Sequence, residues 1–152
     1  MNRAKYPSQE WLKSRFTYND GHLYHLQTHE IVKEYAGSTT NKYKSILIGQ
    51  NGLCLHRLIY IFHFGDGFDQ LDIDHINRDP TDNRIENLRA CTRSLNACNA
   101  KPRTGCKSGV RGISTRASGK WAVMVCGMYL GQFDTLATAI RIREEYISTN
   151  VR

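Results

Sequence analysis

The segment LDIDHINRDPTDNRIENLRACTRSLNACNA, residues 71–100, constrains the fold more than any other part of the chain. Leu71–Ile76 alternates apolar and polar residues, which predicts a short strand with neighbouring side chains on opposite faces. The polar loop that follows contains Pro80, which cannot donate to a regular β-ladder. Leu88–Cys91 predicts a second strand, and Thr92 is a suitable N-cap for a following helix. The expected local order is therefore strand, loop, strand, helix.

A short helix and two hairpins are expected before this segment. Pro7–Glu10 has the serine-and-acid pattern of a helix start. Phe16–His25 alternates around Asp20-Gly21, and Tyr43–Leu55 alternates around Asn51-Gly52; both dipeptides are typical of tight hairpin turns. Periodicity does not decide whether His56–Phe64 is a strand or a helix. We favour a helix, because the run ends at a glycine, the commonest C-cap residue.

The C-terminal third predicts three strands followed by one helix. The strands are expected at 108–115, 120–126 and 128–133, with a turn at 117–119. Asp134 or Thr135 then caps a helix with one apolar face. That face is formed by Leu136, Ala139, Ile140, Tyr146 and Ile147. A three-stranded sheet with a helix across it would bury this stripe.

These patterns indicate an α+β chain built from two modules. Glycine, proline and small polar residues are concentrated between 99 and 109, which is typical of a linker. We therefore expect one domain at 1–100, with its core at about 70–100, a linker at 101–109 and a second domain at 110–152.

Charge is distributed unevenly along a chain whose formal net charge is +7. Residues 101–152 contain nine lysines and arginines against three acids, whereas residues 66–86 contain seven acids against two arginines. A basic module suits a polyanionic partner, and an acidic segment can hold a cation. Two ordinary solvated surfaces remain the alternative on charge alone.

Composition argues against several classes of protein. No apolar run approaches the roughly 20 residues of a membrane helix, and no apolar stretch follows the N-terminus as in a secretory signal. We expect a cytoplasmic protein with five free thiols. Structural zinc is disfavoured, because Cys91, Cys98 and Cys106 are spaced more widely than paired zinc ligands usually are.

The Asp74-His75 dipeptide, the NRIENL segment and the TRSLN segment together resemble the HNH nuclease family in order and spacing. The closest likeness is to phage-type HNH homing endonucleases, in which asparagine closes the motif, and LHRL at 55–58 is also similar. The resemblance implies a ββα-metal core preceded by β-hairpins. It also implies an enzyme that hydrolyses phosphodiester bonds in duplex DNA by nicking or cutting.

Elementary chemistry and the resemblance give roles to four residues. His75 is the candidate general base, because imidazole accepts a proton near neutral pH. The resemblance implies that Asn87 orients its ring by accepting a hydrogen bond. It also implies that Asp74 and Asn96 hold one divalent cation. Oxygen ligands suit Mg²⁺ or Mn²⁺ better than zinc. Taken singly, such residues are more often surface pairs, caps or turns.

The segments around GVRGI, GKWAV and YLGQFDT, at 108–148, resemble the APETALA/ERF-type DNA-binding domain. In that family the sheet lies in the major groove, which implies contacts from its exposed strands. Candidate DNA-binding residues are Arg57, Arg111, Arg116, Lys120 and Trp121. Trp121 is ambiguous, because period two places it on the same face as Val123 and Val125, which are expected to be core. The alternative role for Arg57 and the preceding His56 is to brace the His75 strand.

The sequence thus predicts a divalent-metal-dependent HNH DNA endonuclease without an obligate protein partner. Two other classes remain open. One is a non-catalytic DNA-binding protein that retains an HNH scaffold, and the other is an interaction domain that a bound zinc ion stabilises. The complete Asp74, His75, Asn87 and Asn96 set disfavours the first, and the cysteine spacing disfavours the second.

Overall fold

A computed structural model describes residues 6–37, 42–68, 70–102 and 104–150. The chain divides into two compact units, Met1–Arg89 and Ala90–Arg152, which are treated separately below. Among the described residues, no helix is long and apolar enough to cross a membrane. The observed class is mixed α+β with small antiparallel sheets, as the sequence indicates.

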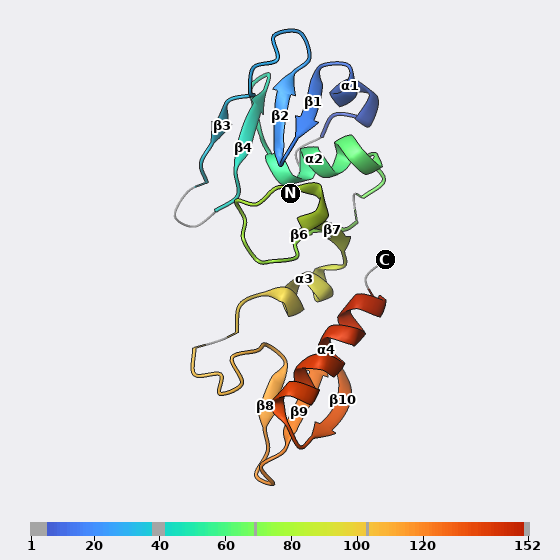
Figure 1. Ribbon diagram of the computed structural model, residues 1–152. Helices are drawn as coiled ribbons and strands as arrows, with labels where there is room; N and C mark the ends of the chain where they lie inside the picture. Colours follow the sequence, from blue (N-terminus) through green and yellow to red (C-terminus); the bar gives the residue numbers. More distant parts are fainter. Residues whose placement is uncertain (1–5, 38–41, 69, 103, 151–152) are drawn as a thin grey trace. The chain divides into compact units, whose positions relative to one another are not determined.

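The first unit begins with the expected helix and hairpin (Figure 1). Helix α1 (Gln9–Lys13) is capped by Ser8, whose hydroxyl accepts from the backbone N–H of Trp11. Strands β1 (Phe16–Asn19) and β2 (His22–His25) pair antiparallel, and Asp20 and Gly21 form the turn with positive φ.

A second antiparallel sheet has the order β3-β4-β5, with β3 at Glu34–Tyr35, β4 at Ser45–Ile48 and β5 at Asn51–Cys54. The expected turn at Asn51-Gly52 is wrong, because the chain turns at Gly49-Gln50 and Asn51 pairs with Ile48. This register places Ile46 opposite Leu53, and both are almost fully buried. Burying that pair on one face decides the register, since a slip would expose it.

Helix α2 (Leu55–Phe64) ends at Gly65, whose φ is +92°, so the expected helix with a glycine C-cap is confirmed. It packs against α1, β5, β6 and the 3₁₀ turn η1 (Ile85–Asn87). Leu55, Leu58 and Ile59 are fully buried in this packing. Each such side chain contributes about 1.5–3 kcal/mol to folding by leaving water, so α2 organises the core of the first unit.

Strand β6 (Asp72–His75) pairs with β7 (Leu88–Cys91), and α3 (Arg93–Asn99) follows, as the sequence predicts. The hydroxyl of Thr92 caps α3 by accepting from the backbone N–H of Leu95. The order strand, loop, strand, helix is therefore confirmed.

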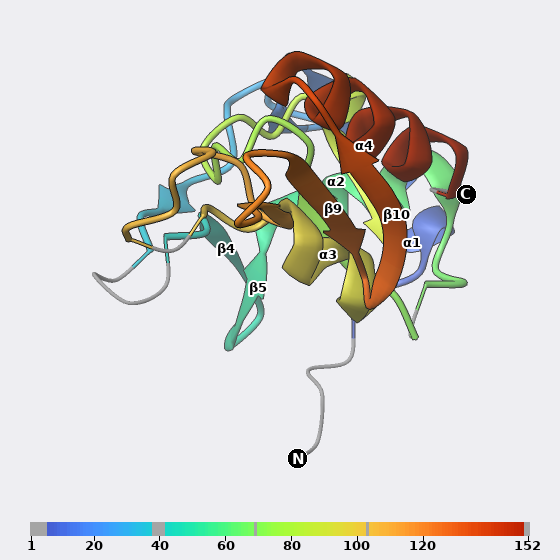
Figure 2. The ribbon, with the colours of Figure 1, turned by 90° about the horizontal axis from the view of Figure 1, so that it is seen from below.

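The second unit contains β8 (Ile113–Thr115), β9 (Trp121–Val125), β10 (Met128–Phe133) and α4 (Leu136–Asn150). The sheet order is β10-β9-β8, all antiparallel, and α4 lies across one face (Figure 2). Thr135 caps α4 by accepting from the N–H of Thr138. The expected apolar stripe of α4 packs against a core of Ile113, Val123, Val125 and Ala139.

The two compact units divide between Arg89 and Ala90, whereas the sequence predicts a linker at 101–109. Helix α3 belongs with the C-terminal sheet, because the buried guanidinium of Arg143 donates from Nη2 to the carbonyl of Cys98 at 2.7 Å. The same guanidinium donates from Nε to the carbonyl of Arg111 at 2.8 Å. A buried arginine that joins the end of a helix to a loop gives the sequence no periodic signal.

Candidate active site

His75 is the best-supported candidate for the general base, because its ring is buried and held on several sides. Only 3% of the residue is exposed, and its Nε2 lies 3.0 Å from Oδ1 of Asn83. An amide oxygen only accepts, so with the Asn83 amide in this orientation the contact is a hydrogen bond in the tautomer that carries the ring proton on Nε2. Nδ1 is then the ring atom that carries the basic lone pair.

Two further rings pack against His75. Tyr43 stacks on it with ring centroids 5.7 Å apart and an interplanar angle of 17°. The ring of His56, on α2, lies 5.2 Å away, and Tyr43 and His56 also contact each other at 4.7 Å. The three rings form a cluster in which His75 has little room to reorient.

His56 is an uncharged member of this cluster. Burial lowers the pKa of His56 to about 3, and the neighbouring His75 and Arg57 act in the same direction. Its Nδ1 is buried without a hydrogen-bond partner among the described residues. Because a charged imidazole there would cost too much, His56 serves as a packing surface for His75 and not as an acid or base.

Asn87 hydrogen-bonds the loop that follows β6, whereas the ring of His75 contacts Asn83. Oδ1 of Asn87 accepts from the backbone N–H of Asn77 at 2.9 Å, and its Nδ2 donates to Asn77 Oδ1 and to the carbonyl of Asp82. These three bonds tie both ends of the 77–82 loop to η1. Asn87 therefore shapes the loop, and Asn83, at its end, holds the histidine.

The sequence offered little to distinguish Asn83 from the other asparagines. The structure shows why it is well placed: the turn of the β1–β2 hairpin abuts it. A Cβ on Gly21 would lie 3.1 Å from the carbonyl carbon of Asn83, and Tyr18 accepts from the N–H of Ile85 at 2.9 Å. The hairpin thus supports the residue that holds the general base.

Asp74 precedes His75 on β6 and offers carboxylate oxygens. Arg89, on the paired strand, donates to Asp74 Oδ2 from Nε at 3.1 Å and from Nη2 at 2.9 Å. Asn96 lies half-buried on α3, in the second unit. Taken separately, a carboxylate and an amide oxygen are hard donors of the kind that suits Mg²⁺ or Mn²⁺. The carboxylate of Asp74 would then contact both Arg89 and such an ion.

The acidic loop residues beyond Asp74 are engaged in local contacts. The backbone N–H and hydroxyl of Thr81 both donate to Asp79, which lowers the pKa of that carboxyl. Arg84 donates twice to Asp82 and lowers the pKa of Asp82 to about 2. Among the described residues, no three of the histidines, cysteines and acids cluster as metal ligands. A cation at Asp74 would therefore depend on amide and water oxygens.

The candidate DNA-binding residues differ in their surroundings. Arg116 is exposed, and Lys120 is exposed with its ammonium 3.1 Å from Asp134. Arg57 is half-buried with its guanidinium 5.3 Å from the ring of Tyr6. Arg111 is half-buried and its carbonyl is bound by Arg143. Trp121 is half-buried and packs against the core cluster, as period two predicts.

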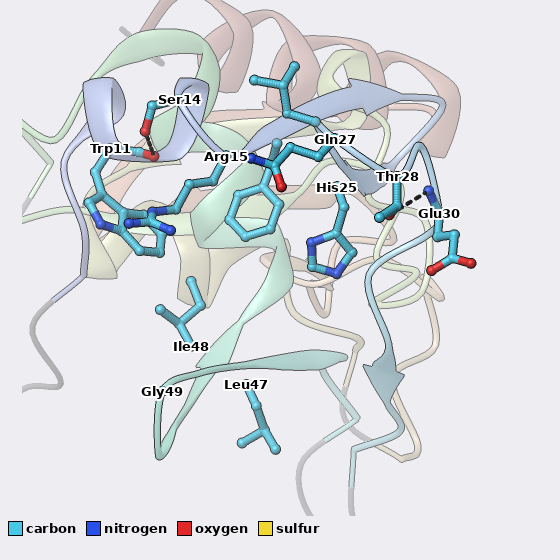
Figure 3. A pocket seen from close by; sticks show the side chains of 12 residues that line it. Trp11, Ser14, Arg15, His25, Gln27, Thr28, Glu30, Leu47, Ile48 and Gly49 are labelled. Carbon is cyan, nitrogen blue, oxygen red and sulfur yellow. Dashed lines mark hydrogen bonds between the residues drawn. The ribbon is translucent and has the colours of Figure 1, made fainter.

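The first unit also contains a groove of about 730 Å³ (Figure 3). It is lined by α1, the end of β2 and the tip of the β4–β5 hairpin, with the guanidinium of Arg15 4.7 Å from the ring of Trp11. None of the candidate catalytic residues lines it.

Comparison with known proteins gives one family and one solved structure. The family model described as HNH endonuclease matches residues 54–98. The structure, described as DNA binding and cleavage by the HNH homing endonuclease I-HmuI, has 26% identity and a TM-score of 0.44. The similarity covers 56% of this chain and 51% of that one, so this chain spans about half of that protein. No curated protein matches. The family match ends at 98, and the APETALA/ERF-like resemblance of 108–148 is not supported.

Proposed function

We propose that this chain is a divalent-metal-dependent HNH endonuclease that hydrolyses phosphodiester bonds in duplex DNA, as a nicking or cutting enzyme of the phage homing type. The family match supports this, because residues 54–98 include Asp74, His75, Asn87 and Asn96. The observation that carries the proposal is the contact between His75 and Asn83, which supports a role for Nδ1 of His75 as the base.

The protein's own residues perform most of the proposed step. Nδ1 of His75 takes the proton from a water molecule as that water attacks phosphorus, opposite the leaving 3′-oxygen. Asn83, Tyr43 and His56 keep the ring in one orientation, so little reorganisation is needed at the moment of reaction. Asp74 and Asn96 would hold the cation, which when bound neutralises charge developing on the phosphate and the leaving oxygen.

DNA binding is proposed for Arg57, Arg111, Arg116 and Lys120. Arg116 and Lys120 flank the turn between β8 and β9 and are exposed. Arginine and lysine on such a surface meet phosphates and carry the salt-dependent part of affinity.

One observation favours the alternative, a non-catalytic DNA-binding protein that retains the scaffold. Arg89 already neutralises Asp74, with both side chains largely buried. If Arg89 excludes the cation, binding would persist without cleavage.

The test incubates supercoiled plasmid and phage DNA with the protein and Mg²⁺, Mn²⁺ or EDTA. We expect cleavage that requires the metal and falls by at least about 100-fold in His75→Ala, with duplex binding retained. His29→Ala, at an exposed turn residue, is the matched control and should cleave normally. Full activity of His75→Ala would remove the catalytic assignment. Binding by the wild-type protein without cleavage under any metal would favour the alternative.

A further inference from the structure

Two thiols of the second unit lie unusually close together. Sγ of Cys98, at the end of α3, is 2.9 Å from Sγ of Cys126, in the turn between β9 and β10. The backbone N–H of Cys126 also donates to Cys98 Sγ at 3.1 Å. A disulfide has its sulfurs about 2.05 Å apart, so a movement of less than about 1 Å would bring these two to bonding distance.

The backbone of the β9–β10 turn provides a second, independent observation. Val125 pairs with Met128, so Cys126 and Gly127 form a two-residue hairpin turn with φ values of +52° and +83°. Such turns require positive φ at both positions and usually contain asparagine, aspartate or glycine at the first. Cysteine is an unfavourable choice there. What it provides is a sulfur directed at Cys98.

The surrounding fold holds the backbone at both cysteines in place. Arg143, which is only 2% exposed, donates to the carbonyl of Cys98 and fixes the end of α3. The two-residue turn fixes Cys126. Because both cysteines are already held in place, a bond between them costs little conformational entropy. The native geometry therefore favours one disulfide over a separate small-molecule adduct on each cysteine.

The thiols are accessible to a small reagent. Both residues are partly exposed and line a cavity of about 620 Å³ that also contains Arg111 and Cys106. Cys106 is engaged elsewhere, because its sulfur contacts Ser108 Oγ at 3.2 Å and the carbonyl of Val110 at 3.5 Å. The Ser108 hydroxyl also lowers the pKa of Cys106. Cys106 is therefore a reactive neighbour but not the geometric partner.

We propose that Cys98 and Cys126 form a reversible disulfide by exchange with a small-molecule disulfide such as oxidised glutathione. The thiolate of one cysteine attacks a glutathione sulfur, which gives a mixed disulfide and releases one glutathione thiolate. The second cysteine thiolate then attacks the protein sulfur and releases the second glutathione. In sum, two protein thiols lose two electrons and two protons, and one glutathione disulfide becomes two glutathione thiols. The new bond ties α3 to the β9–β10 turn.

The test equilibrates the full chain with oxidised and reduced glutathione, alkylates the remaining thiols and maps tryptic peptides by mass. We expect a link between peptides Ser94–Arg103 and Trp121–Arg141, with three of the five thiols still alkylated. The link should persist when reduced glutathione exceeds the oxidised form about tenfold. Glutathione adducts that persist on Cys98 or Cys126, or a link to Cys106, would overturn the proposal.

Two serine variants complete the experiment. Cys126→Ser should abolish the link and leave a glutathione adduct on Cys98. Cys106→Ser, the matched control from the same cavity, should keep the link. Loss of the link in Cys106→Ser alone would assign the chemistry to another pair. The wild-type peptide map decides the proposal even if a variant folds poorly.

Discussion

Nε2 of His75 lies 3.0 Å from Oδ1 of Asn83, although the two residues are separated by the whole 77–82 loop. Both residues are 3% exposed, so the contact is shielded from water. A buried acceptor that fixes the tautomer of an imidazole decides which nitrogen can act as a base. Asn83 is therefore a positioning residue for the proposed reaction.

Asn83→Ala should lower single-turnover cleavage by about 100-fold at saturating Mg²⁺, because the ring loses its fixed tautomer and orientation. Duplex binding, measured by gel shift, should not change. Asn83→Asp keeps an oxygen acceptor in place and should retain more activity than the alanine variant. Wild-type cleavage by Asn83→Ala would show that the other ring contacts suffice.

Gly21→Ala and Gly49→Ala form a matched pair for the hairpin that supports Asn83. Both glycines have positive φ, but a Cβ on Gly21 would lie 3.0 Å from the backbone nitrogen of Arg84, whereas a Cβ on Gly49 meets nothing within 4 Å. Both variants should lose about 1 kcal/mol of stability from backbone strain. Gly21→Ala alone should also lower cleavage, by about tenfold, by displacing Asn83. Equal cleavage rates in the two variants, measured alongside thermal unfolding, would contradict this coupling.

Local signals predicted most elements of the fold. Ser8 and Thr92 cap their helices as expected, and the strands at 72–75 and 88–91 lie where alternation places them. The turn of the second hairpin was misplaced, because pairing Ile46 with Leu53 outweighs the turn preference of Asn51-Gly52. Burial across strands is a tertiary effect that a dipeptide rule does not contain.

The candidate site was predictable in its residue types but not in its hydrogen bonds. The family resemblance indicates His75 and Asp74, yet the acceptor for His75 depends on how the loop folds back, which brings Asn83 to the ring and Asn87 to the loop. The Tyr43 ring comes from a distant segment, and sequence separation hides such contacts. Similarly, the contact of Arg143 with α3 joins segments that are far apart in the sequence.

His56 predicts a specific pH dependence of stability. Its pKa is about 3 in the folded chain and about 6.5 when unfolded, so the unfolded state takes up a proton first as the pH falls. The stability that the folded chain gains from a neutral His56 is fully present above about pH 7. It is lost progressively as the pH falls to about 3. Between pH 7 and pH 5 the loss is about 2 kcal/mol.

His56→Leu removes this proton uptake. Urea unfolding of the wild type and the variant at pH 7 and pH 5 should show that the wild-type protein loses about 2 kcal/mol more on acidification. His63, whose pKa is also lowered by burial, is present in both proteins and cancels in the difference. Equal losses in the two proteins would mean that His56 is protonated in the folded state.

Arg143→Met should destabilise the second unit by about 2 kcal/mol, because the carbonyls of Cys98 and Arg111 lose a charged donor while buried. Arg143→Lys should recover only part of this, since one ammonium does not reproduce the guanidinium fork. In a Trp11→Phe background, Trp121 is the remaining tryptophan and its fluorescence reports the second unit alone. An unchanged denaturation midpoint would show that Arg143 is dispensable for joining α3 to the sheet.

Arg116→Ala should weaken binding to duplex DNA, and the slope of log affinity against log salt should fall by about one for a single lost phosphate contact. Lys120→Ala should have a smaller effect, because Asp134 already neutralises part of its charge.

Arg141→Ala is the matched control. Arg141 lies on α4, which covers one face of the sheet, and pairs with Glu145 at 2.6 Å. Titrations at several salt concentrations separate the three variants. If Arg141→Ala lowers the slope as much as Arg116→Ala, DNA approaches α4 and the turn between β8 and β9 is the wrong surface. If only Arg116→Ala lowers it, the turn between β8 and β9 meets the phosphates.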